Sequence, residues 1–180
     1  MKKVLLISAE FVRAHASISN EMQDKFLKPS IQEAQDIHLE QVLGTKLVNK
    51  LCELVRTGAI GEVENTKYKE LLDRSQFFLM YQTLAIMTVT ASVKFSNAGL
   101  YTTNDENMTQ IPLDDVFKMQ SMFQNKSDYY KDRLQDYCKE NYKKFPELKS
   151  CGLYDVKPVL DSAASCPIFL GGARGRKVRR

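Results

Sequence analysis

The sequence has little proline and little glycine, with 5 and 8 copies among 180 residues. Both residues punctuate the many turns of a strand-rich sandwich, so their scarcity favours long helices. Hydrophobic residues make up 43% of the chain and charged residues 27%, within the range of globular proteins. We therefore expect a mainly α-helical bundle, and the chain length fits one substantial domain.

Cysteine and histidine are also scarce, with 4 and 2 copies. The cysteine spacing contains no CxxC or other metal-binding pattern. We expect reduced thiols, with a single disulfide between Cys151 and Cys166 as the alternative. His38 lies beside the apolar side of an amphipathic helical pattern. That position favours a boundary residue over a catalytic or metal-binding one.

Familiar catalytic motifs are absent, including HExxH, DxD and GxSxG. The stretch from Gly171 to Lys177 is glycine-rich and basic, but it lacks the spacing of a Walker A loop and its Ser/Thr after the lysine. Asp114 and Asp115 precede a helical pattern, where carboxylates stabilise a helix N-terminus. We therefore expect no enzymatic activity, no catalytic residue, no cofactor and no metal site.

Long apolar runs of the kind that cross a membrane are also lacking. The run from Val4 to Ile7 is too short for a signal peptide, and Glu10 follows closely. Residues 75–93 contain no charged side chain, but they include two glutamines, three threonines and serines. This polar content is heavy for a lipid-facing helix, so we expect a helix buried inside a protein and no membrane partner.

Helix signals follow one another along the first half of the chain. Ser8 is placed to cap a short helix over 9–14. Pro29 is expected to end a second short helix, because it cannot continue the hydrogen-bond ladder. Ser30 and Glu33 then have the form of a capping box. The helix after it is expected to bury Ile31, Ala34, either Ile37 or His38, and Val42.

Glycines and threonines mark the next helix boundaries. Gly44 suits the left-handed position after a helix, and Thr45 is placed to cap the next helix, which Gly58 stops. Asn65 or Thr66 opens the longest pattern, which is apolar on two sides and reaches Phe95. A helix apolar on two sides is usually central. Hydroxyls of threonines within it are expected to bond to carbonyls one turn back; these are Thr83, Thr88 and Thr90.

A polar stretch over 97–112 separates the two longest helical patterns. We expect a long loop there, or a hairpin with strands around 100–102 and 108–111. The helix that begins near Asp114 repeats apolar residues every seven positions and is expected to end at Pro146. The repeating residues are Val116, Phe123, Tyr130 and Tyr137.

Two segments near the C-terminus, 156–160 and 167–170, are apolar, adjoin prolines and are expected to be extended. An exposed apolar segment needs a cover, either the helical body or another subunit. We therefore divide the chain into a helical domain over 1–149 and an extended basic arm over 150–180.

Five of the last ten residues are basic and none is acidic. Without them, 21 of the 26 basic residues remain against 22 acidic ones, so the tail makes the chain basic. Such a tail favours contact with an acidic partner or nucleic acid; a solubility tail or a disordered end is the alternative. The candidate contact residues are Arg174, Arg176, Lys177, Arg179 and Arg180.

The order of these features resembles a known family. The stretch 26–35 contains the pattern L-x-P-x-I-x-x-A-Q and leads into Val42-Leu43-Gly44. The central helix runs into Phe95-Ser96-Asn97-Ala98-Gly99-Leu100, and the last helix runs into residues 141–148. Over residues 5–148 the chain resembles the head–tail connector (adaptor) proteins of tailed bacteriophages, especially the crAss-like phages of Bacteroidales.

This resemblance implies a structural virion protein of the tail or neck region, assembled in the host cytoplasm. The subunit would form a ring, commonly of twelve copies, beneath the portal protein. The ring would extend the channel for double-stranded DNA and present a surface to the next tail or ring protein. The alternative from the residues alone is a helical nucleic-acid-binding protein that uses its basic tail as the DNA contact.

Overall fold

The computed structural model describes residues 4–16, 24–96, 99–102, 112–149, 152 and 155–160, and within these ranges the protein is mainly α-helical, as predicted. A single two-stranded hairpin is its only sheet there. The α-helices are α1 (Ala9–His15), α2 (Asp24–Glu33), α3 (Glu40–Leu43), α4 (Thr45–Thr57), α5 (Thr66–Ser92) and α6 (Leu113–Glu140). A π-helix, η1 (Ala34–Leu39), joins α2 to α3, and short 3-10 turns are η2 (Ala59–Gly61), η3 (Val63–Asn65), η4 (Tyr142–Lys144) and η5 (Pro146–Lys149).

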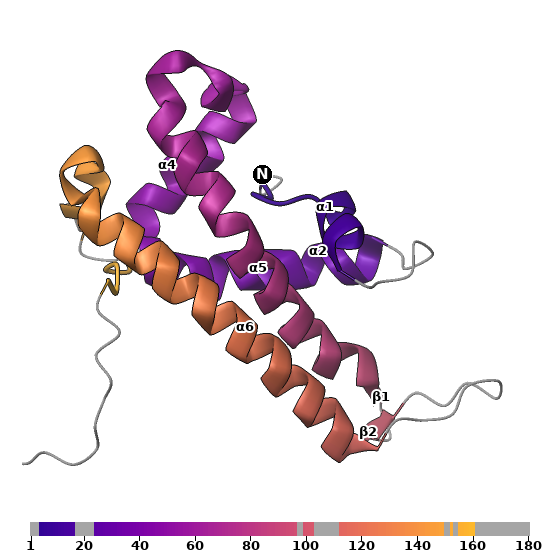
Figure 1. Cartoon of the computed structure of the whole chain (residues 1–180). Coiled ribbons are helices and arrows are strands. Elements are labelled where there is room, and N and C mark those ends of the chain that lie inside the picture. Colours follow the sequence, from indigo (N-terminus) through magenta and orange to yellow (C-terminus); the bar gives the residue numbers. More distant parts are fainter. Residues whose placement is uncertain are drawn as a thin grey trace, which may run out of the picture.

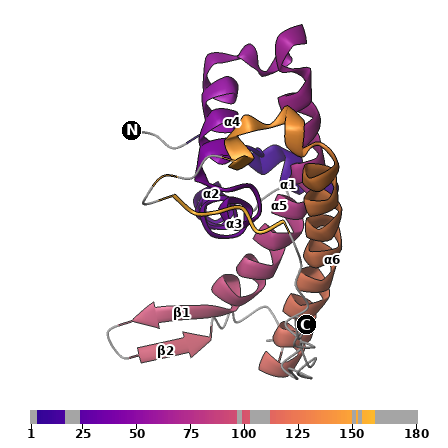
Figure 2. The same ribbon diagram turned by 90° about the vertical axis from the view of Figure 1, so that its left-hand side faces the viewer.

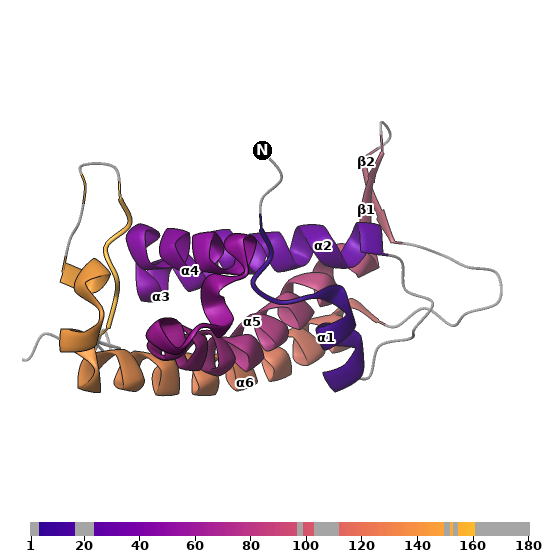
Figure 3. The ribbon, with the colours of Figure 1, turned by 90° about the horizontal axis from the view of Figure 1, so that it is seen from above.

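The two longest helices, α5 and α6, lie side by side and antiparallel, and they make the largest contact in the molecule (Figure 1). Seen from above, α5 lies between α6 on one side and α2 with α3 on the other (Figure 3). Its buried residues therefore surround the helix, which confirms the prediction of a central helix. The hydroxyls of Thr83, Thr88 and Thr90 donate to carbonyls four residues back, also as predicted.

The helix α1 begins where the sequence indicated. Ser8 is its N-cap, and the Ser8 hydroxyl accepts a hydrogen bond from the Phe11 backbone N–H at 3.0 Å. Val12 is fully buried on its inner side. The helix therefore follows from a local cap and one apolar contact with the core.

The predicted helix boundary at Pro29 is wrong, because α2 runs through this proline. Proline in a helix interior costs about 3 kcal/mol. Leu27 and Ile31 on either side of it are fully buried, and each such side chain contributes about 1.5–3 kcal/mol. The capping box is wrong for the same reason: Ser30 is buried inside the helix, and its hydroxyl donates to the Phe26 carbonyl.

The π-helix η1 changes which residues face the core. Ala34 and Val42 are buried as expected, but Ile37 is 47% exposed, while His38 turns inward. The wider turn of a π-helix adds a residue and shifts the helical phase. Gln35, also buried, accepts from the Leu6 N–H at 3.0 Å and donates to the Val4 carbonyl at 3.1 Å, fixing the N-terminal segment.

Gly44 separates α3 from α4 with a positive φ of +79°, as expected, but its ψ of +155° places it outside the left-handed helical region. Gly58 ends α4, as predicted, and it is the residue that adopts the left-handed helical conformation. Thr45, however, does not cap α4, since Gly44 is the N-cap. The Thr45 hydroxyl instead donates to Glu40 and accepts from the Val156 N–H at 2.8 Å.

The central helix ends at Ser92 and not near Phe95, because the chain continues as a β-hairpin. Strand β1 (Val93–Ser96) pairs antiparallel with β2 (Gly99–Thr102). The expected strand at 100–102 is confirmed, but its partner is β1, and the other expected strand at 108–111 lies outside the described residues. The hairpin projects from the end of α5 (Figure 2).

The last helix, α6, carries Asp114 and Asp115 in its first turn, as expected. It ends at Glu140 and not at Pro146, since two 3-10 turns, η4 and η5, take over. Phe145 between these turns is fully buried, so the chain turns back to cover the core. Of the expected seven-residue repeat, Val116 and Tyr137 are buried, and Phe123 and Tyr130 pack against the core cluster.

Residues 156–160 have no helical structure and lie against the junction of α3 and α4. The Thr45 N–H donates to the Val156 carbonyl at 3.2 Å, and the Val159 N–H donates to the Gln41 carbonyl at 2.9 Å. Gln135 of α6 donates to the Val159 carbonyl at 2.6 Å. The helical body therefore holds the backbone of this segment, while the Val156 and Val159 side chains stay 42% and 53% exposed.

Candidate interaction surfaces

A groove lies between the C-terminal end of α1, the second half of α5 and the first half of α6. Its volume is about 480 Å³. Three methionines contribute to its lining, and Lys126 and His15 supply its polar rim. The lining residues are His15, Ala16, Tyr81, Leu84, Met87, Thr88, Ala91, Met119, Met122, Phe123 and Lys126. We call this the methionine groove.

The antiparallel packing of α5 and α6 creates the methionine groove. Met87, near the end of α5, therefore lines the same groove as Met119 and Met122, near the start of α6. Met87 is buried in the floor, whereas Met119 and Met122 are 41% and 45% exposed on the rim. Methionine is flexible and polarizable, so such a surface can adapt to the shape of an apolar partner.

A cluster of aromatic rings supports one wall of the methionine groove, which two of these rings, His15 and Tyr81, line. Tyr130 of α6 stacks on both Phe77 and Tyr81 of α5, with ring centroids 5.5 and 5.6 Å apart. Phe11 and His15 of α1 stack at 4.2 Å and meet the same cluster through Phe77. Because contacts between rings hold all three helices, the wall is formed before any partner binds.

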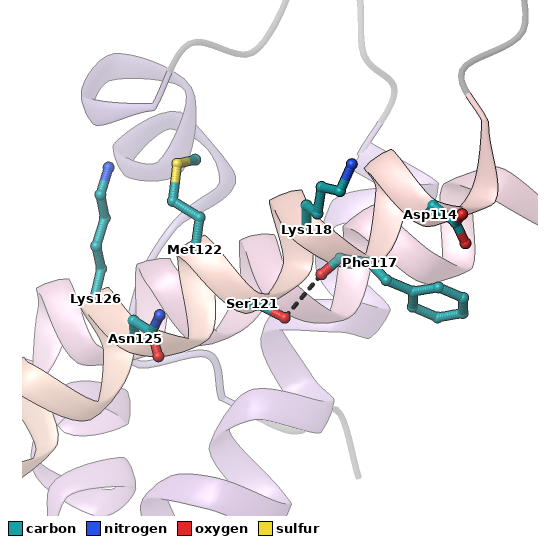
Figure 4. Close-up of a pocket in the computed structure, with 7 residues that line it drawn as sticks. All are labelled: Asp114, Phe117, Lys118, Ser121, Met122, Asn125 and Lys126. Carbon is teal, nitrogen blue, oxygen red and sulfur yellow. Dashed lines mark hydrogen bonds between the residues drawn. The ribbon is translucent and has the colours of Figure 1, made fainter.

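A second, exposed surface of α6 lies beside the groove (Figure 4). A shallow depression there is lined by both apolar and polar side chains, but Phe117 points away from Met122. Between them the Ser121 hydroxyl donates to the Phe117 carbonyl at 2.9 Å. The two apolar side chains thus belong to opposite edges of the helix, and only Met122 belongs to the groove.

A buried polar chain links three elements inside the molecule. Gln82 of α5 lies with its amide nitrogen 3.0 Å from His38 Nε2, and Ser127 of α6 donates to the Gln82 carbonyl oxygen at 2.9 Å. Since the amide nitrogen can only donate, His38 Nε2 is an acceptor and carries no proton. Burial also lowers the pKa of His38. His38 therefore joins the core as a neutral group, consistent with the predicted boundary position.

Among the described residues there is neither a cluster of metal-ligating side chains nor a membrane-spanning helix. Within them, no group of three or more His, Cys, Asp or Glu side chains is placed to hold a metal ion. No helix in these ranges is long and apolar enough to cross a membrane. Cys138 is a buried free thiol, and burial raises its pKa to about 12.

The five basic residues predicted to contact a partner, Arg174, Arg176, Lys177, Arg179 and Arg180, lie outside the described residues, as does the apolar segment 167–170. The methionine groove, in contrast, was not predicted. Its residues come from three helices that are far apart in the sequence, so no local pattern marks them. The available signal was a set of methionines at the facing ends of two long helices that one loop joins.

The fold and the groove define a mainly helical protein with a preformed apolar surface. The chain belongs to a family of unknown function, DUF6712, whose model matches residues 39–158. The matched region starts at the end of η1 and closes with the segment that lies against Gly44. No curated protein and no solved structure matches the chain.

Proposed function

We propose that this protein is the subunit of a head–tail connector ring in a tailed bacteriophage. In this role it docks beneath the portal protein, extends the DNA channel and presents a surface to the next tail or ring protein. The sequence resemblance over residues 5–148 motivates the proposal. The role is structural, and it places the protein in the tail or neck of the virion.

The observation that carries the proposal is that the two flanks of the α5–α6 pair differ. The methionine groove opens on the flank of α1, and residues 156–160 lie on the flank of α3. A closed cyclic ring repeats one heterologous interface, so each subunit needs two different faces. A twofold dimer, in contrast, uses a single self-complementary patch on each subunit.

The basic tail adds an electrostatic argument. Twelve copies would gather roughly 60 positive charges, enough to attract DNA or an acidic portal surface. The same five residues support the second candidate function, a helical nucleic-acid-binding protein. The two candidates differ in what they need: a connector needs a ring or a portal, whereas a DNA-binding protein needs neither.

Native mass measurement of the full chain, with and without a cognate portal protein, tests the proposal. We expect a ring of defined copy number or a portal-dependent complex. A chain without Gly171–Arg180 is the matched variant and is expected to dock more weakly. A chain that stays monomeric with portal present, and binds DNA with strong salt dependence, would replace the connector with the nucleic-acid-binding function.

A further inference from the structure

The methionine groove and the C-terminal segment lie on opposite edges of α6. Gln135, which holds the Val159 carbonyl, comes nine residues after Lys126 on the groove rim. At 3.6 residues per turn, these two side chains point about 180° apart around the helix. Figures 1 and 3 show that residues 155–160 and α1 are also separated along the molecule, since they lie toward its opposite ends.

The chain beyond Leu160 contains one short apolar segment, Pro167-Ile168-Phe169-Leu170. Six residues separate it from Leu160, so an extended connection reaches about 23 Å. To reach its own groove, the segment would travel about 14–24 Å along α6 and also pass around a helix about 10–12 Å wide. The outer face of α6 is a mixed surface, on which Asp114, Lys118 and Asn125 lie beside the exposed Phe117.

We propose that Pro167–Leu170 of one copy docks in the methionine groove of the next copy around the ring. The inference rests on the proposed function, because a heterologous ring brings one flank of a subunit against the opposite flank of its neighbour. A groove of about 480 Å³ is within the size range of pockets that bury small apolar ligands.

The chemistry of the two surfaces matches. Ile168 and Phe169 supply large apolar side chains, which cost free energy if they stay in water. Met87, Met119 and Met122 present thioethers that pack well against an aromatic ring. Tyr81 also lines the groove, and its phenol hydroxyl is a polar group that the backbone of an incoming segment can pair with.

A disulfide experiment on the full chain tests the docking, because Cys166 directly precedes the apolar segment. Met122→Cys places a thiol on the groove rim, and Cys151→Ser in the same chain removes a competing cysteine. Mild oxidation is expected to give a covalent ladder of dimers, trimers and higher species on a non-reducing gel. A ladder is expected because each copy would be joined to the next one around the ring. A disulfide requires Cα atoms about 4.4–6.8 Å apart, so it forms only if the segment lies in the groove.

Phe117→Cys is the matched control, since Phe117 is 52% exposed, close to the 45% of Met122, but lies on the other edge of α6. It is expected to give at least fivefold less ladder. Adding Phe169→Asp to the Met122→Cys chain is expected to reduce the ladder by a similar factor. Native mass measured in parallel reports whether these variants still form the ring.

Equal ladders from Met122→Cys and Phe117→Cys would overturn the docking, and so would a product joined only within one chain. If rings form in either case, the connector function stands and the inference alone fails. If the unmodified chain forms no ring with or without portal, the proposed function fails, and the docking between copies fails with it. A ladder from Met122→Cys that Phe169→Asp abolishes establishes the docking.

Discussion

At the scale of single residues, Gly44 allows the C-terminal segment to pack closely against the helical body. Its φ is +79°, and a Cβ there would lie 2.9 Å from Pro158 Cδ and 3.1 Å from the Val156 carbonyl oxygen. Gly58 has a φ of +74° but nothing within 4 Å of the added atom. Gly44 is also the more strained position, since its ψ of +155° places it in a region essentially restricted to glycine, whereas Gly58, with a ψ of +1°, lies in the left-handed helical region.

We expect Gly44→Ala to lower the free energy of unfolding by about 2–4 kcal/mol, because strain and displacement of the segment add together. Gly58→Ala should cost only about 1–2 kcal/mol, since strain acts there alone. Urea unfolding of both variants measures the difference. Equal losses would show that the contact between Gly44 and Pro158 contributes nothing to stability.

His38 makes stability depend on pH. Burial lowers the pKa of its imidazole; the charge of Lys131 also lowers it, and Glu33 and Asp128 oppose the shift. The unfolded chain therefore takes up a proton near pH 6.5, before the folded protein does. The stabilisation from a neutral His38 is present above this pH and is lost as the pH falls below it.

Unfolding of the natural chain and of His38→Gln between pH 8 and 5 checks this expectation. The stability of the natural chain relative to the variant should decrease as the pH falls through about 6.5. Other titrating groups are common to both proteins and cancel in the difference. A difference that is constant with pH, or that grows on acidification, contradicts the role assigned to His38.

At the scale of elements, two tyrosine–glutamate pairs connect α5 to the end of α6 and to η5. Tyr68 donates to the Glu147 carboxyl group at 2.7 Å, and Tyr137 donates to Glu70 at 3.0 Å. Burial raises the pKa of Tyr68, and it raises the pKa of Tyr137 to about 12. Both phenols therefore stay protonated as donors, and Phe145 packs between their rings.

Tyr68→Phe is expected to destabilise the protein by about 1.5–3 kcal/mol, because it removes a donor from a partly buried carboxyl group. Tyr142→Phe is the control, since Tyr142 is exposed and its ring contact with Lys149 survives the change. Thermal unfolding measures both variants. Similar midpoints for the two would mean that the Tyr68 bond is replaced by water at no cost.

The elements differ in how far the sequence predicts them. Ser8, Gly58 and the acidic start of α6 act through local backbone hydrogen bonds and charge, so they predict boundaries well. Pro29 misleads because buried neighbours offset its local cost. Phe95 fits the apolar spacing of α5, so the sequence assigns it to the helix, but it lies in β1, which pairs with β2.

The candidate site shows the same division. The methionine groove depends on the register between two antiparallel helices and on α1, which no short pattern contains. Its residues have ordinary helical spacing within each helix. The groove is thus a product of tertiary packing, while the basic residues from Arg174 to Arg180 were predicted from local composition and remain a prediction.

At the scale of the whole molecule, the region matched by the family and the packed part of the chain both extend into residues 156–160. The match ends at residue 158, inside the segment that contacts α3, α4 and α6. A division of the chain at 149, as the composition indicated, would therefore separate residues 156–160 from the helices that hold them. These residues attach the arm to the body at a defined point.

We therefore expect a chain ending at Leu160 to be more stable than one ending at Asp155, by about 1–3 kcal/mol. The shorter chain loses the hydrogen bonds of Val156 and Val159 and leaves the buried Gln135 amide without its acceptor. In the full chain, Val159→Pro removes the N–H that donates to Gln41 and also restricts the backbone at 158 and 159, whereas Val159→Ala keeps the N–H. Urea unfolding should show a loss for the proline variant and almost none for the alanine variant, because the Val159 side chain is exposed. Equal stability of the two truncated chains would mean that the arm is not anchored by these contacts, and its path to a neighbouring subunit would then begin at the end of η5.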